Sequence, residues 1–417
     1  MKMKIFLVGY LFLFIYRPFE VYSILETIHL ERLWMLAALG YFFFSGAVKK
    51  HPVKGVGPVV LFAAAMFLSA LGAQDLDRWW RTTENFLKVV VFYFLLATSI
   101  DSEEDLIDIL YAYVVIMFIY EAKSLYEYLF HGRVEFRMGV KRLIGHDQSG
   151  ADPNALASTI NYSLSFAYVL YTRFKDELGR ARQKKILVGY MLVSILCIFM
   201  TGSRTGAVTL FVLAVLLWFN VQYKVRWLFA FVVLTALIWN LLPYEKRIRL
   251  ETLWNEDVEM EGIEGAKFMQ ATQKSTEGRK EGFWDGVRLL RAYPMTGAGA
   301  GNFANARQRV RDVPLEQELQ AHNLYGQLMG ELGGFGIVAF LSLLFSILRM
   351  NLLVIRERAE GLYPVAWACL ISLLLLLING LAGHNLYRYN WLWIAAFSSI
   401  QFWIVQQRHE ASKEPVT

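Results

Sequence analysis

Long apolar segments alternate with short polar connections along the whole chain. Segments of about eighteen or more mostly apolar residues are long enough to cross a bilayer as helices. We predict twelve such spans, at 4–22, 30–48, 56–73, 84–100, 106–130, 153–173, 185–201, 205–221, 225–242, 322–348, 362–382 and 387–406. The pattern predicts an all-α polytopic membrane protein. Spans 1–9 lie within 1–242, spans 10–12 lie within 322–407, and 408–417 is a short tail.

One long polar connection, 243–321, interrupts this alternation. Within it, apolar residues from Phe283 to Leu290 recur at helical spacing, and Pro294 is expected to end that helix. The glycine-rich TGAGAGNF follows. A dinucleotide-binding fingerprint would need a strand before these glycines and a helix after them, in a βαβ unit. We therefore predict a loop with short helices and a tight turn where backbones approach closely.

Composition supports the membrane assignment. The 417 residues are 56% hydrophobic, and the mean hydropathy is +0.37, which is more apolar than is usual for soluble domains. Cys197 and Cys369 both fall within apolar spans, so no disulfide framework is implied. The N-terminus has lysines before an apolar run but no small-residue cleavage site before Arg17. We interpret it as a retained first span.

Charge distribution predicts the orientation. Alternate short connections carry eighteen Lys/Arg on one side and ten on the other, and the richer side should be cytoplasmic. Both termini are then cytoplasmic, and the loop 243–321 lies outside, in the periplasm of a cell with two membranes. Because the net charge of +6 resides in these connections, it does not indicate nucleic-acid binding.

The last long connection ends at a candidate catalytic group. His322 and Asn323 precede a segment that is almost uncharged as far as Ile347, with Glu331 as its lone charge. Gly326 and Gly330 form a small-xxx-small pair that lets another helix approach closely. Histidine titrates near neutral pH, which suits proton transfer. The alternative interpretation is that His322 only caps a membrane helix at the interface.

Cationic side chains are expected on the same outer face. Arg204, in TGSRTG, stands between two apolar spans, and a charge so close to hydrocarbon is a functional hypothesis by default. Arginine grips phosphate oxygens through a planar, permanently charged fork. The candidate residues for binding a phosphate or pyrophosphate group are Arg204, Arg279, Arg288, Arg291, Arg81 and Lys88. For Arg81 and Lys88, beside Trp79 and Trp80, an interfacial belt with snorkelling cations is the alternative.

Other chemistries find less support. The outer face shows no His/Asp/Glu cluster with metal-ligand spacing, because its acidic residues gather in 256–264. No nucleophile-elbow motif supports serine catalysis. We therefore predict neither a metal nor a cofactor.

Three motifs resemble the O-antigen ligase superfamily. HNLYGQLMGELGGFG is similar to its histidine motif, GRKEGFWDGVRLLRAYPMTGAGAGNF to its outer loop, and TGSRTG to its arginine between two helices. DPNALA, at 152–157, also resembles a recurrent family stretch. The similarity runs in order over 152–336.

The resemblance implies a GT-C-type membrane glycosyltransferase that takes a glycan from undecaprenyl pyrophosphate without a metal. Arg204 and Arg279 would bind the pyrophosphate, and His322 would act on the acceptor hydroxyl, with Asn323 and Glu331 in support. Arg288 and Arg291 do not align with the family arginine, so their role is a local inference. The partners would be the lipid-linked glycan and an acceptor, either lipid A-core or a growing polysaccharide.

Other activities remain open at this point. The superfamily includes polysaccharide polymerases and protein O-oligosaccharyltransferases; the latter usually carry a longer C-terminal region than this chain has. A transporter or flippase for lipid-linked sugars is the alternative from another class. It predicts internal repeats and polar residues deep in several spans, which the sequence does not clearly contain.

Overall fold

The computed structural model describes residues 2–45, 51–137, 140–148, 150–174, 177–219, 221–255, 263–311, 320–359 and 361–411. Within these ranges, the side chains of Lys2, Arg137, Leu178 and 263–276 are not described. The predicted acidic run at 256–264 and most of the predicted tail 408–417 therefore lie outside the description. The fold is nearly all-α, as predicted, with 79% of the chain helical.

The described chain divides into two compact units, 1–44 with 107–274 and 45–106 with 275–417. The divisions fall inside α7 and α13. The elements of the first unit are α1 (Lys2–Tyr16), α2 (Pro18–Val21), α3 (Ser23–Thr27), α4 (Leu30–Phe44), α7 (Glu103–Phe130), β1 (Val134–Arg137), β2 (Val140–Leu143), α8 (Pro153–Phe174), η2 (Leu178–Arg180), α9 (Ala181–Met200), α10 (Arg204–Trp218), α11 (Lys224–Leu241) and α12 (Tyr244–Glu251). Those of the second are α5 (Val56–Leu68), η1 (Ser69–Gly72), α6 (Leu76–Ser99), α13 (Ile263–Ala292), α14 (Phe303–Arg311), α15 (Leu324–Arg356), α16 (Tyr363–Gly380) and α17 (Asn390–Ala411).

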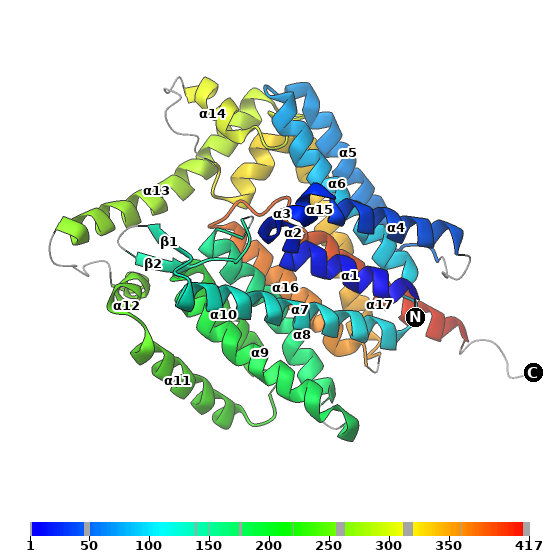
Figure 1. The fold of residues 1–417 in the computed structure, drawn as a ribbon. Coiled ribbons are helices and arrows are strands. Elements are labelled where there is room, and N and C mark those ends of the chain that lie inside the picture. The colour runs from blue at the N-terminus through cyan, green and yellow to red at the C-terminus, as the bar shows by residue number, and fades with distance from the viewer. Residues whose placement is uncertain are drawn as a thin grey trace, which may run out of the picture. The chain divides into compact units, whose positions relative to one another are not determined.

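In the first unit, α8 packs against α9 and α10 (Figure 1). Gly206 permits the close approach of α10, because a Cβ there would lie 2.6 Å from the Cβ of Ala157. Asn161 of α8 donates to the carbonyl of Gly206 at 3.0 Å and to the hydroxyl of Thr209 at 2.9 Å. Small residues and interhelical polar bonds of this kind hold helices together where both face lipid.

In the second unit, α15 packs against α5, α16 and α17 (Figure 1). Phe340 and Trp391 meet edge to face, with ring centroids 5.0 Å apart, in the core between α15 and α17. Deeper in the same pair of helices, Asn351 donates to Ser398 at 2.7 Å. These contacts fix α15, which begins two residues after the candidate histidine.

Four helices of the described chain are long and apolar enough to cross a membrane: α9, α11, α15 and α16. They correspond to the expected spans 185–201, 225–242, 322–348 and 362–382. The other eight expected spans and the outer position of 243–321 stay predictions.

The predicted first span, 4–22, is wrong as a continuous helix. Helix α1 ends at Tyr16, Arg17 has a left-handed φ of 49°, and Pro18 begins the separate helix α2. Proline disfavours helical backbone at the residue before it and carries no N–H, so a helix ends there. The antiparallel β1–β2 hairpin, which pairs Glu135 with Arg142, was likewise not anticipated.

Candidate functional site

His322 stands immediately before the N-terminus of α15. The cap is Asn323, whose side-chain oxygen accepts from the backbone N–H groups of Tyr325 at 2.9 Å and Gly326 at 3.0 Å. Asn323 is buried and also donates to the carbonyl of Leu381 at 3.1 Å. His322 is left exposed, with a left-handed φ of 45°, a conformation that costs a non-glycine residue free energy. A capped helix therefore presents the imidazole at its mouth, and Asn323, not His322, does the capping.

The second half of α13 packs backbone against backbone with the His322 segment. A Cβ on Gly282 would lie 1.8 Å from the carbonyl oxygen of Ala321, and one on Gly286 would lie 2.4 Å from Cα of Gly326. Residues 279, 282 and 286 share one helix face, because three- and four-residue steps return to the same side. Arg279 thus lies about one turn from the contact with Ala321, on the face of α13 that meets His322 and its neighbours.

A second histidine lies against His322. The rings of His322 and His384 are in edge-to-face contact, with centroids 5.4 Å apart. His384 begins a second copy of the tetrapeptide HNLY, at 384–387, in the connection between α16 and α17. The sequence analysis did not pair His384 with His322. The repeated tetrapeptide was the signal available.

Glu331 binds the glycine-rich turn rather than the histidine. Its carboxylate accepts from the Gly301 N–H at 2.7 Å and from the Tyr387 hydroxyl at 2.6 Å. The backbone of the turn pairs with α15 as well, because Ala298 N–H donates to the carbonyl of Gly330 at 2.8 Å. Glu331, fully buried, therefore fixes the turn to the helix that carries His322.

The small-xxx-small prediction for α15 is confirmed. Gly326 meets the backbone of Gly282 and Phe283, and Gly330 meets the side chains of Phe303 and Leu289. The tight turn predicted after Pro294 is also confirmed: Gly297, Gly299 and Gly301 all have positive φ.

Arg288 is engaged in an ion-pair network centred on Asp285. Arg288 reaches this buried carboxylate at 2.6 Å and Arg311 reaches it at 2.7 Å, while Arg307 also pairs with it. Arg307 and Arg311 lie on α14 and were not singled out from the sequence. Glu281 also pairs with Arg307 at 3.1 Å and with Arg311 at 3.6 Å. Three arginines against two carboxylates leave this cluster with a small excess of positive charge.

The remaining predicted cations of this unit occupy exposed or self-paired positions. Arg291 is exposed in the last turn of α13. Arg81, also exposed, donates to the carbonyl of Asp77 one turn earlier at 3.3 Å. Lys88 pairs with Glu84 of its own helix at 3.2 Å. The binding role of Arg81 and Lys88 stays a prediction.

Arg204 belongs to the first unit and is the first residue of α10. Ser203 caps the helix, accepting from the Gly206 N–H at 3.1 Å. The Arg204 guanidinium is half-buried and donates to the hydroxyl of Thr252, just after α12, at 3.4 Å. It therefore stands at a helix N-terminus, where partial positive charge already favours anions.

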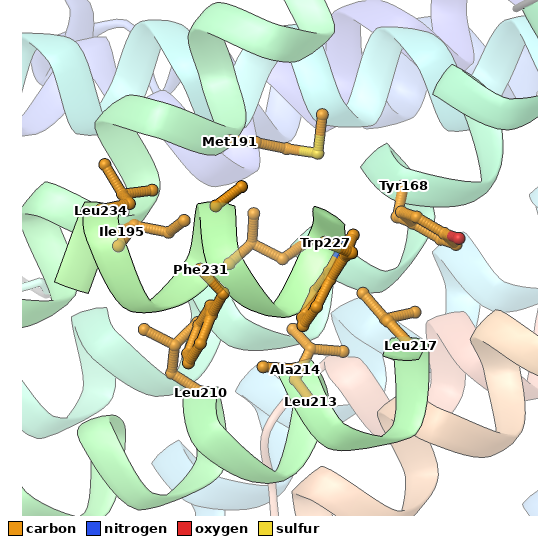
Figure 2. Close-up of a pocket in the computed structure, with 12 residues that line it drawn as sticks. Tyr168, Met191, Ile195, Leu210, Leu213, Ala214, Leu217, Trp227, Phe231 and Leu234 are labelled. Atoms are coloured by element: carbon orange, nitrogen blue, oxygen red, sulfur yellow. The ribbon is translucent and has the colours of Figure 1, made fainter. Parts of the chain in front are cut away.

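Helix α10 also lines an apolar cavity of about 210 Å³, together with α8, α9 and α11 (Figure 2). Leu210, Leu213 and Leu217 face it from α10, and Trp227 and Phe231 face it from α11. This lining suits an apolar chain rather than proton transfer. Among the described residues there is no group of three or more His, Cys, Asp or Glu side chains placed to hold a metal ion.

A comparison with known proteins covers several of these residues. Residues 189–341 match the family model described as O-antigen ligase, and the resemblance drawn from the three motifs is thereby confirmed. The matched region contains Arg204, Arg279 and His322. No curated protein matches the chain.

Proposed function

We propose that this chain, which matches the O-antigen ligase family model over residues 189–341, is a membrane glycosyltransferase of that superfamily. It moves a glycan from undecaprenyl pyrophosphate to an acceptor hydroxyl at the periplasmic face of the bacterial inner membrane. The observation that carries the proposal is the exposed His322, presented by a capped helix and flanked by the face of α13 that bears Arg279.

The proposed reaction is a single displacement. The acceptor hydroxyl oxygen attacks the anomeric carbon, the bond from that carbon to the pyrophosphate oxygen breaks, and the configuration inverts. His322 takes the hydroxyl proton as general base. Undecaprenyl pyrophosphate departs with the bonding electrons, and its charge is stabilised by arginine forks.

We assign Arg279 and Arg204 to the pyrophosphate, as the family motifs imply. Arg291, Arg81 and Lys88 remain weaker candidates for the same role. Arg288 is assigned with Arg307 and Arg311 to the positive field around Asp285, which attracts anionic substrates without gripping them. Asn323 and Glu331 support the site by fixing the helix and the turn. No metal is required by this scheme.

Within the superfamily, we favour transfer to lipid A-core or to a growing polysaccharide. A ligase and a polymerase differ in their acceptor, and the same displacement reaction can transfer the glycan to either one.

The test separates proton transfer from donor binding on detergent-purified protein. General-base catalysis is typically worth about a hundred- to ten-thousand-fold, so His322→Ala should lose that much transfer yet keep its affinity for the donor. Arg279→Ala should instead weaken donor binding. His409→Ala, which removes an exposed histidine of α17, is the matched control and should transfer normally. Normal transfer by His322→Ala, or failure through lost donor binding alone, would overturn the base assignment.

A further inference from the structure

The turn that precedes Arg204 is held by two buried arginines from distant parts of the chain. Arg142 donates through Nε to the carbonyl of Thr201 at 2.8 Å. Arg249 donates through Nε to the carbonyl of Gly202, also at 2.8 Å. Arg142 is only 2% exposed and Arg249 only 8%. Two consecutive carbonyls of one short turn are thus each bonded to a buried charged side chain.

Arg142 connects this turn to the hairpin and to α8. It lies on β2, pairs with Glu135 of β1 at 3.2 Å and donates to the side-chain oxygen of Asn154 at 3.0 Å. The same Asn154 oxygen accepts from the hydroxyl of Ser203 at 2.8 Å. The cap of α10 and the carbonyl two residues before it are therefore bound into one network with the first turn of α8.

Arg249 connects the turn to α12. Gly202 has a positive φ of 58°, and a Cβ there would lie 3.5 Å from Cδ of Arg249, so the arginine runs directly over the glycine. Thr252, one residue beyond α12, accepts from Arg204 itself. Helix α12 consequently contacts both the turn and the arginine that follows it.

Buried arginines are costly unless they are paired and hydrogen-bonded, and two that converge on one turn repel each other. We propose that Arg142 and Arg249 are positioning residues for Arg204. They fix the Thr201–Ser203 turn, and with it the direction in which the Arg204 guanidinium leaves the start of α10. The functional part of this inference rests on the proposed function, since it takes Arg204 as a pyrophosphate ligand.

The experiment measures binding of undecaprenyl pyrophosphate to the full-length protein in detergent. Loss of one hydrogen bond to a charged group is worth about tenfold in affinity, so Arg249→Gln should raise the Kd about tenfold. Glu245→Gln, at an exposed position of the same helix, is the matched control and should change the Kd by less than about twofold, because exposed surface changes are nearly neutral. A merely structural role would lower the number of binding sites per protein and leave the Kd of the remaining sites unchanged.

A double-mutant cycle tests whether the effect passes through Arg204. In an Arg204→Ala background, Arg249→Gln should add less than about twofold to the Kd, because residues acting through one another are not additive. Additive effects, or a normal Kd in Arg249→Gln, would overturn the inference. Arg142→Gln should repeat the pattern.

Hydrogen exchange gives a second readout that does not depend on ligand. The backbone amides of 201–205 should exchange faster in Arg249→Gln than in Glu245→Gln, because the turn has lost one of its anchors. Unchanged exchange would show that the arginines do not hold the turn. If the wild type binds no undecaprenyl pyrophosphate, the proposed function fails while this arm still tests the anchoring.

Discussion

At the scale of single residues, Lys246 is a buried cation whose charge opposes folding. It is 1% exposed, and its ammonium donates to the hydroxyl of Tyr128 at 2.8 Å. Burial, reinforced by the nearby Arg142, lowers the pKa of Lys246 from 10.5 to about 8. Keeping it protonated in the folded state therefore costs about 3 kcal/mol near neutral pH.

We expect Lys246→Met to raise the thermal midpoint at pH 7, since the substitution removes this cost and keeps the side chain's length. Between the folded pKa of about 8 and an unfolded value near 10.4, the unfolded chain binds more protons than the folded chain. The stability that Lys246 contributes must then rise with pH in this window, and the advantage of the variant should shrink. Melting both proteins at pH 7 and pH 10 measures this. A difference that is constant with pH would contradict the burial of an ionised lysine.

His384 is the residue that the proposed site adds to the predicted set. Edge-to-face ring contacts are worth about 0.5–1.5 kcal/mol, so losing the partner of His322 should cost roughly two- to twelvefold in transfer. We expect this loss in His384→Ala and its recovery in His384→Phe, which restores a ring. Transfer rates at matched expression measure it. If phenylalanine does not rescue, the imidazole nitrogens of His384 matter and the contact is more than packing.

At the scale of elements, the glycine-rich turn and α15 complete each other's hydrogen bonding. Helix α15 breaks at Gly333, with φ 59° and ψ −154°. On one side of the break, the carbonyls of Gly330 and Glu331 accept from Ala298 and Gly299. On the other, Gly334 and Phe335 donate to the carbonyls of Pro294 and Met295. The hydrogen bonds of the turn therefore bridge the break in the helix.

Gly297→Ala should disrupt this hydrogen bonding between the turn and α15. Gly297 has φ 69°, and a Cβ there would lie 2.3 Å from the backbone of Glu331, so the turn must shift. The cost should exceed about 1 kcal/mol, the scale for alanine at positive φ. Gly278→Ala in α13, where a Cβ meets nothing within 4 Å, is the control. Thermal midpoints in detergent compare the two, and equal midpoints would show that the turn is free to move.

Helix boundaries are predictable from the sequence where a capping residue or a proline marks them. Asp152, which precedes Pro153, accepts from Asn154 N–H at 2.6 Å at the start of α8. Helix α13 ends at Ala292, just before Pro294, as expected. Helix α13 is longer than the expected amphipathic stretch. Residues before Phe283 lack apolar periodicity, so the hydrophobic pattern does not predict a helix there. They include good helix formers, and their intrinsic helix propensity extends the helix.

The candidate site was predictable only in part, because much of it comes from contacts between distant segments. His322 and Arg204 stood out as polar groups beside apolar runs. The bonds of Arg142 and Arg249 to Thr201 and Gly202 join segments 59 and 47 residues apart. No local pattern encodes such a pairing. The same holds for Arg307 and Arg311 around Asp285.

At the scale of the whole molecule, the proposed function requires the loop 243–321 to lie on the outer side of the membrane. Cysteines introduced at the exposed positions 253–255 should react with an impermeant maleimide applied from outside, and cysteines at 177–184 should not. Both native cysteines are buried, so the background should be low. The reverse labelling pattern would place the loop 243–321 in the cytoplasm and remove the periplasmic reaction.

The hydrogen bonding across the break at Gly333 also constrains how α15 is inserted into the membrane. A span that leaves the translocon as an ordinary helix carries all its backbone bonds within itself, since each unmet group in hydrocarbon costs several kcal/mol. Helix α15 cannot meet this condition alone, because four of its backbone groups pair with residues 294–299. Those residues precede α15 in the chain and are synthesised before it. Insertion of this span should therefore be timed with the docking of a segment that has already emerged, so that membrane integration and tertiary folding occur here as one event.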